Sequence, residues 1–103
     1  MAAALALAPA AQADESFPCK VKDVTVFSGR IHVRCTTMTA AGIYFFALPT
    51  SNGVQANRLL TIGSTALVSG RKFVAIYDPG DTSGAAWGCQ ANDCRALLGF
   101  AIE

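Results

Sequence analysis

The chain has 103 residues, which is enough for one domain and too few for two. Its 8 basic and 7 acidic residues nearly balance, so the sequence offers no electrostatic footprint for a nucleic-acid partner. A hydrophobic content of 52% with only 15% charged residues excludes a disordered chain. The single histidine, His32, excludes a multi-histidine metal site and argues against most catalytic triads.

Residues 1–13 are nearly all alanine and leucine, and Ala11-Gln12-Ala13 is a small-x-small triplet ahead of Asp14-Glu15. This pattern predicts a secretory signal peptide over residues 1–13. The apolar run is about half of the roughly twenty residues that a bilayer span needs, so no membrane insertion is expected. Because no Lys or Arg precedes the run, an alanine-rich leader without signal function remains the alternative. If residues 1–13 are a signal peptide, residues 14–103 are expected to form a single secreted or periplasmic domain.

Four cysteines follow this segment, and an even number in a small exported chain predicts two disulfides. Three pairings are open to four cysteines, and the sequence does not decide among them. We favour Cys19–Cys35, because these residues flank a predicted hairpin, together with Cys89–Cys94, because the four polar residues between them can form a turn. A zinc site is the competing interpretation, but the spacings do not give close cysteine pairs on both sides.

The first predicted strands are residues 21–27, rich in β-branched side chains, and residues 31–35, which alternate with period two. Ser28-Gly29 between them favours a tight hairpin. A third strand over residues 43–48 is apolar on both faces and ends at Pro49. We expect both of its faces to be covered, one by the core and the other by a helix or a neighbouring subunit.

The clearest helix follows this strand. Asn52 is suited to cap its start with Gln55 completing a capping box, and Gly70 is suited to end it. An apolar stripe at helical spacing lies between these caps and comprises Ala56, Leu59, Leu60, Gly63, Ala66 and Leu67.

The remainder of the chain predicts a strand over residues 73–77, a turn at Asp78-Pro79-Gly80-Asp81, a loop over residues 82–94 and a closing strand over residues 95–102. The fold class is therefore β-rich α+β, with one helix between the third and fourth of five strands. The OB fold, a small five-stranded barrel, has this strand count and this helix position.

Part of this pattern resembles a known family. The segment from Ala56 through Gly80, with Ala66-Leu67-Val68-Ser69-Gly70 running into Phe73-Val74-Ala75-Ile76-Tyr77-Asp78-Pro79-Gly80, resembles the B subunits of the subtilase-cytotoxin and typhoid-toxin type. The hairpin from Val24 to Cys35 and the closing Leu97-Leu98-Gly99 are also similar. Short exported proteins of Gram-negative bacteria share this layout, and the resemblance covers most of the chain after residue 13.

The resemblance implies an OB-type fold, a ring of five subunits and recognition of sialylated glycans. Tyr77 falls where the family places a tyrosine that contacts the glycan. Lys20 falls near the position of the family's glycan-binding serine and departs from the pattern, so the carry-over of ligand specificity is limited. Fold alone does not fix function.

Candidate catalytic and metal-binding groups are few. His32 alternates with buried positions beside Arg34 and is predicted to be an exposed surface residue, because no nucleophile and acid accompany it in a recognised arrangement. Asp78, Asp81 and Asp93 lack the ligand spacing of a calcium loop, so Asp78 and Asp81 are read as part of a solvated turn. The sequence also lacks phosphate-loop and nucleophile-elbow motifs.

The ligand-binding candidates are Tyr77 and Trp87, with Arg95 in support, because aromatic residues with a polar tip often stack on sugars or contact proteins. Packing in the core is the alternative role for both aromatic residues. The cluster Tyr44-Phe45-Phe46 fits either a subunit interface or core packing.

These observations predict a non-catalytic binding module that acts outside the cytoplasm, on a glycan or a protein partner, without cofactor or metal. The alternative function is a structural or assembly protein of the bacterial envelope that oligomerises through a sheet edge or its aromatic strand. A homo-oligomer fits both hypotheses, and an enzyme is the least favoured class.

Overall fold

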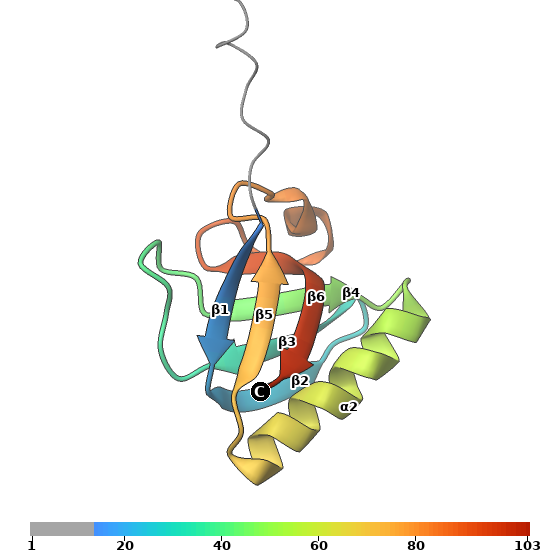
Figure 1. Ribbon diagram of the computed structural model, residues 1–103. Coiled ribbons are helices and arrows are strands. Elements are labelled where there is room, and N and C mark those ends of the chain that lie inside the picture. Colours follow the sequence, from blue (N-terminus) through green and yellow to red (C-terminus); the bar gives the residue numbers. More distant parts are fainter. Residues whose placement is uncertain (1–13) are drawn as a thin grey trace, which may run out of the picture.

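The computed structural model describes residues 14–103 (Figure 1), and the predicted signal peptide at residues 1–13 lies outside the described residues. Six strands, one α-helix and a short 3₁₀ helix, η1, make up the domain. In chain order they are β1 (Glu15–Cys19), β2 (Val21–Val26), β3 (Arg30–Cys35), β4 (Phe45–Pro49), α2 (Gly53–Ser69), β5 (Phe73–Tyr77), η1 (Ser83–Trp87) and β6 (Cys94–Ile102).

The six strands form one open mixed sheet in the order β1-β5-β6-β4-β3-β2. Strands β1, β5 and β6 pair antiparallel, as do β2, β3 and β4, and a parallel pairing of β4 with β6 joins the two groups. Figure 1 shows β1, β5 and β6 running steeply in front of β2, β3 and β4, which cross behind them. The α+β class is confirmed, whereas the prediction of a closed five-stranded OB-like barrel is wrong.

The predicted number of strands, five, was too low because the sequence of β1 carries only weak signals for a strand. Its sequence, Glu-Ser-Phe-Pro-Cys, includes Pro18, which has no N–H for a sheet ladder. The strand lies at the edge of the sheet, where only one side must pair, and its partner is β5. Although only Lys20 separates β1 from β2, the two strands are the opposite edges of the sheet, so the barrel does not close.

The helix has the predicted ends. The Asn52 side chain accepts a hydrogen bond from the Gln55 N–H at 3.4 Å, and Gly70 adopts a left-handed φ of 71° where the helix stops. The capping box is only half formed, because the Gln55 side chain accepts from Arg58 at 2.8 Å instead of reaching back to Asn52. One face of α2 packs on the sheet through Ala56, Leu59, Gly63 and Ala66.

Gly63 lets the helix approach the sheet closely. A Cβ atom at this position would lie 3.0 Å from a Val33 methyl and 3.2 Å from a Val24 methyl. Leu60 and Leu67, which belong to the predicted apolar stripe, lie at its border and remain exposed. The helix therefore packs closely on β2 and β3 at Gly63, and Leu59 is the large side chain that it buries in the contact.

The core contains Phe46, Phe73, Ile43, Leu59 and Val33, all almost fully buried. The β4 strand is covered on both faces, as its apolar sequence predicts. Phe46 and Leu48 enter the main core, and the other face packs against residues of the segment between β5 and β6. This cover is a disulfide-bonded loop rather than the expected helix or subunit.

Both favoured disulfides are confirmed. Cys19–Cys35 ties the end of β1 to the end of β3, and Cys89–Cys94 closes the loop that leads into β6. Both are consistent with an oxidising compartment such as the periplasm or the cell exterior. Within residues 14–103, no helix is both long enough and apolar enough to cross a membrane.

Candidate functional site

Three polar side chains share one face of β3. Arg30, His32 and Arg34 alternate with the buried Ile31, Val33 and Cys35, so period two places them opposite the core. The sequence predicts an exposed His32, but this residue is only 7% exposed, and that prediction is wrong. The face is covered by groups that come from elsewhere in the chain.

The cover is the disulfide loop, defined here as residues 83–94. Its helix η1 packs against β4 and β6, and the Cys89–Cys94 disulfide lies in a small second core with Ala47, Phe45 and Trp87. Gly88 ends η1 with a φ of 101°, a conformation that residues with a Cβ rarely adopt. A Cβ at this position would also clash with the Arg30 guanidinium, so the glycine allows the arginine to lie against the loop backbone.

A cavity of about 200 Å³ opens between β3, β4 and the disulfide loop. It combines a guanidinium, an imidazole, an amide and a carboxylate with an aromatic wall. The residues that line it are Arg30, His32, Phe45, Gly88, Gln90, Asp93 and Cys94. Pockets for drug-sized ligands usually span about 300–1,000 Å³, so this cavity fits a single small ring or headgroup.

Aromatic rings hold the imidazole of His32 in place. Its ring centroid lies 4.7 Å from that of Phe45 and 5.3 Å from that of Phe27, the second contact being edge-on. The Arg30 guanidinium stacks over the ring of Phe27, with its Cζ atom 4.2 Å from the ring centroid. Phe27 is 43% exposed at the end of the β2–β3 hairpin, so it adds an aromatic surface next to the cavity.

The two arginines of this face differ in their partners. Arg34 donates from Nε to Oδ2 of Asp23 at 2.7 Å and also donates to the same carboxylate through its terminal nitrogen. Within residues 14–103, no carboxylate lies within ion-pair distance of Arg30. The Arg30 guanidinium is therefore the cation of the cavity that is available to a ligand.

Burial of the imidazole, and next the positive charge of Arg30, lower the pKa of His32 from its ordinary value of 6.5. Arg34 acts in the same direction, whereas Asp23 and Asp93 oppose the shift. The Asp23 carboxylate lies 4.0 Å from Nε2 of His32. The imidazole is thus held neutral at neutral pH, and its protonation would add a second positive charge beside Arg30.

This pKa shift predicts acid destabilisation that depends on His32. The unfolded chain takes up the histidine proton near pH 6.5, whereas the folded domain does so only at lower pH, so acid favours the unfolded state. The His32 contribution to the free energy of unfolding should be complete above pH 6.5 and decline as the pH falls below it. Urea denaturation at a series of pH values, compared with His32→Gln, measures this contribution. Greater stability of the parent chain relative to the variant on acidification would contradict the expectation.

The sequence-predicted site residues lie in two places. Tyr77 is 3% exposed; its ring centroid lies 5.0 Å from that of Phe46 and its hydroxyl donates to Glu15 at 3.5 Å. Burial, followed by the charge of Glu15, raises the pKa of the Tyr77 hydroxyl. Arg95 is near this end of β5, because its Nε donates to the carbonyl oxygen of Pro79 at 2.8 Å. A ligand at Tyr77 would have to displace Glu15.

Arg95 also donates to the backbone carbonyl oxygens of Ala91 at 2.6 Å and Cys94 at 2.7 Å, so it braces the disulfide loop. Trp87 is half-buried and packs in the second core rather than beside Tyr77. The structure therefore does not bring the three predicted residues into one pocket. Gly88 and Cys94, the sequence neighbours of Trp87 and Arg95, do line the cavity.

Sequence reasoning missed Arg30, His32 and Phe45 as members of one site. The available signal was the series Arg30, His32 and Arg34, which puts three basic side chains on one strand face. The missing information was the loop some sixty residues further along the chain, which folds over that face.

The predicted turn at Asp78-Pro79-Gly80-Asp81 is confirmed. The Asp78 carboxylate accepts from the Gly80 N–H at 2.9 Å, and the Asp78 carbonyl oxygen accepts from the Asp81 N–H at 3.1 Å. Across residues 14–103, no cluster of three or more His, Cys, Asp or Glu side chains has an arrangement suited to a metal ion.

Comparison of the chain with protein-family models, with curated proteins and with solved structures found no significant match. The resemblance to toxin B subunits therefore stays a prediction from the sequence pattern, and functional inference rests on the cavity itself.

Proposed function

We propose that the domain is a non-catalytic binding module, secreted or periplasmic, whose ligand is a terminal sugar of a glycan. The proposal places the sugar in the cavity between β3 and the disulfide loop. One observation carries it: aromatic rings and an unpaired guanidinium meet there in a hollow of about 200 Å³ that fits a single small ring.

The groups of the cavity match the two kinds of surface on a sugar. An apolar C–H face can pack on Phe45, the aromatic residue that lines the cavity beside His32, as sugars do on aromatic residues. The hydroxyl groups can accept hydrogen bonds from Arg30 and Gln90, and can donate to Asp93. His32 at the floor of the cavity serves as a neutral hydrogen-bonding group.

Two further observations support the proposal. The first favours binding over catalysis, and the second favours a location outside the cytoplasm. None of the lining residues carries a hydroxyl or a free thiol, so the cavity offers no activated nucleophile next to His32. Cys94, which lines the cavity, is held in a disulfide, and disulfides persist in oxidising compartments.

A glycan array followed by calorimetric titration of the best glycan tests the proposal. Arg30→Ala should weaken binding by about tenfold or more, because a charge-assisted hydrogen bond contributes on the order of 1.5–3 kcal/mol. The matched control is Arg58→Ala on α2, where the arginine is exposed and bonds to Gln55; its affinity should equal that of the parent chain.

Tyr77→Phe tests the site predicted from the sequence in the same titration. It removes the hydroxyl and leaves the buried ring in place, so stability is largely kept. Loss of affinity with Tyr77→Phe, and not with Arg30→Ala, would move the site to the end of β5. If the chain binds no glycan, the proposal is wrong both for the cavity and for the end of β5.

The open sheet favours assembly as the second candidate function. Strands β1 and β2 are sheet edges, and edge strands can add a strand from another chain. The aromatic β4 strand is less suited to this role, because both of its faces are covered. Light scattering tests this role: a strict monomer rules it out, whereas a defined oligomer fits both candidate functions.

A further inference from the structure

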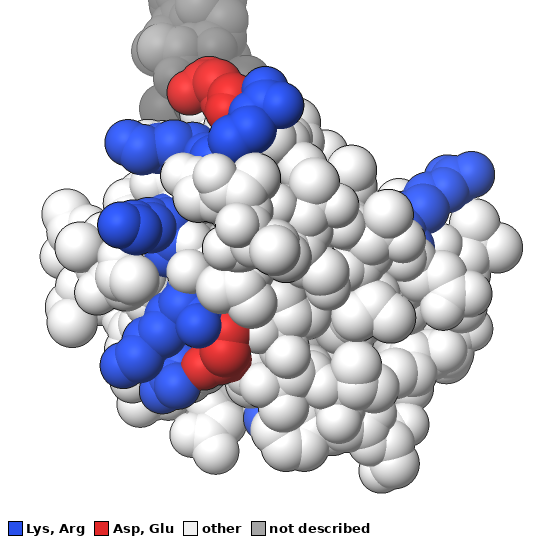
Figure 2. Space-filling view, turned by 90° about the horizontal axis from the view of Figure 1, so that it is seen from below, with Lys and Arg blue, Asp and Glu red and all other residues white. Residues whose placement is uncertain are grey.

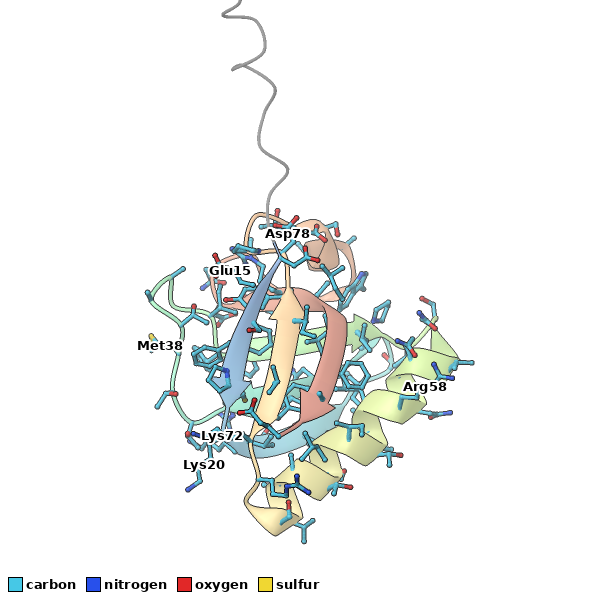
Figure 3. The ribbon with its side chains drawn as sticks, in the orientation of Figure 1. Glu15, Lys20, Met38, Arg58, Lys72 and Asp78 are labelled. Carbon is cyan, nitrogen blue, oxygen red and sulfur yellow. A yellow bond between two sulfur atoms is a disulfide. The ribbon has the colours of Figure 1, made fainter. Side chains whose placement is uncertain are left out.

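The charges of the domain separate toward its two ends. Strands β1 and β5 pair with Cys19 opposite Phe73 and with Glu15 opposite Tyr77. Lys20 follows Cys19 and Lys72 precedes Phe73, so both lysines come to one end of this strand pair, whereas Glu15 and Asp78 come to the other. Figure 3 shows this arrangement, with Glu15 and Asp78 labelled at one end and Lys20 and Lys72 at the opposite end. The separation is not complete, because Glu103 lies beside Lys72 and Arg95 lies beside Pro79 near the Glu15 end.

The end that carries the lysines is called the basic end and comprises Lys20, Lys22, Arg34, Arg71 and Lys72. Lys22 and Arg34 join it because Val21 pairs with Cys35 next to the β1–β2 junction. Figure 2 looks at this end and shows most of the Lys and Arg atoms in view gathered along one side, with two smaller groups of Asp or Glu atoms against them.

The lysines of the basic end are not neutralised internally. Among the described residues, Asp23 pairs with Arg34 and lies 4.0 Å from the neutral His32, and no carboxylate lies within ion-pair distance of a lysine ammonium. Lys20, Lys22 and Lys72 are all exposed. The Arg71 side chain donates from Nε to the backbone oxygen of Glu103, at 3.3 Å. The cations therefore face solvent and can meet an external anion.

Large apolar side chains project beside these cations. Val68 is 84% exposed, more than any other large hydrophobic residue described, and stands three positions before Arg71. Met38 is 60% exposed and lines a hollow of about 280 Å³ together with Lys22, Arg34 and Tyr44. Exposed apolar groups next to unpaired cations are the combination found on proteins that bind the interface of a membrane.

We propose that the basic end docks on an anionic lipid surface. The lysines would meet lipid phosphates, while Val68 and Met38 enter the layer between headgroups and acyl chains without any segment crossing the bilayer. A soluble polyanion would be attracted by the cations alone and would leave the two apolar side chains in water. The lipid surface is the partner that uses both features.

The orientation follows from the fold. The disulfide loop leads from the acidic end of β5 to the start of β6, so Gln90 and Asp93 of the cavity lie in the half of the domain away from the basic end. Docking by the basic end leaves that half turned to the surrounding solution. The lipid proposal does not depend on the identity of the cavity ligand.

Flotation with vesicles tests the proposal on the full-length chain, so that residues 1–13 contribute equally to every variant. The parent chain should bind vesicles of equimolar phosphatidylcholine and phosphatidylglycerol, and should bind pure phosphatidylcholine at least tenfold more weakly. Binding should fall steeply between about 0.1 M and about 1 M salt, because the screening length shrinks from about 10 Å to about 3 Å. Equal binding to both kinds of vesicle, or to neither, overturns the proposal.

Two pairs of variants locate the contact. Lys20→Gln/Lys72→Gln should lower the partition coefficient about twenty-fivefold, since each surface cation contributes about fivefold, whereas Arg58→Gln should leave it unchanged. Val68→Ser should lower it severalfold, and Val54→Ser is the matched control, because Val54 is 62% exposed at the opposite end of α2.

A soluble polyanion, dextran sulfate, distinguishes charge alone from a lipid surface. Vesicle binding that is lost in the lysine variant, unchanged in Val68→Ser and competed fully by dextran sulfate would identify a polyanion partner and overturn the lipid assignment. Glycan binding by the cavity is measured independently with the Arg30 variant, so failure of either proposal can be recognised separately.

Discussion

Removal of the Cys19–Cys35 disulfide by Cys19→Ala/Cys35→Ala is expected to lower the free energy of unfolding by about 3 kcal/mol. The cross-link joins residues 16 apart, and the loss of chain entropy in an unfolded loop of that length gives this value. It also ties the edge strand β1 to β3, two strands that do not pair in the sheet. Small domains have total stabilities of about 5–15 kcal/mol, so the loss is a large fraction.

The second disulfide supplies a matched control. Cys89 and Cys94 are only 5 residues apart and are equally buried, so Cys89→Ala/Cys94→Ala should cost about 2 kcal/mol by the same entropy relation. Urea denaturation followed by circular dichroism measures both. A larger loss for the Cys89–Cys94 variant would contradict the ranking and would indicate that the disulfide loop contributes more than its short cross-link implies.

Phe46→Ala is expected to cost about 3–5 kcal/mol, the usual range for truncation of a buried phenylalanine. Phe46 has no exposed surface, and its ring lies 6.1 Å from that of Phe17 on β1 and 5.0 Å from that of Tyr77 on β5. Strand β4 belongs to one half of the sheet and both partners belong to the other. The substitution therefore opens a void where the two halves pack together.

The control for this prediction is Phe27→Ala, which removes an identical side chain that is 43% exposed. Its cost should stay below about 1 kcal/mol, because surface substitutions have small effects on stability. Phe27 also supports Arg30, so this variant should weaken the proposed glycan binding while it stays folded. Equal losses of stability for the two variants in urea titrations would show that Phe46 does not hold the halves together.

Elements with strong local signals could be predicted from the sequence. Helix α2 begins after Asn52 and ends before Gly70 because a side-chain cap and a glycine are short-range determinants. Strand β5 has the predicted bounds, 73–77, since it is a short apolar run between charged and turn residues. The two disulfides were also favoured correctly, from the positions of the cysteines relative to strands and turns.

The sheet topology could not be predicted in the same way. The parallel pairing of β4 with β6 joins residues near 45 to residues near 94, and no local pattern encodes this contact. Strand β1 has a proline and few β-branched residues, so its pairing with β5 also depends on the tertiary structure. An open sheet of six strands thus replaced the more economical barrel of five.

The candidate site was hidden from the sequence for the same reason. His32 alternates with buried residues, which normally places a polar side chain in solvent. It is buried here because Phe27, Phe45 and the disulfide loop surround it. The pattern identified the strand face correctly, whereas the burial of that face depends on a loop that is distant in the chain.

The parallel pairing of β4 with β6 has a consequence for folding during synthesis. Strands β2, β3 and β4 are neighbours in sequence and can pair as they are synthesised. Within the hydrogen-bonded sheet, however, they are connected to β1 and β5 only through β6, which follows every other strand. Long-range pairing of this kind slows folding relative to local pairing. A nascent polypeptide therefore cannot acquire its finished tertiary structure before residues 94–102 have been translated.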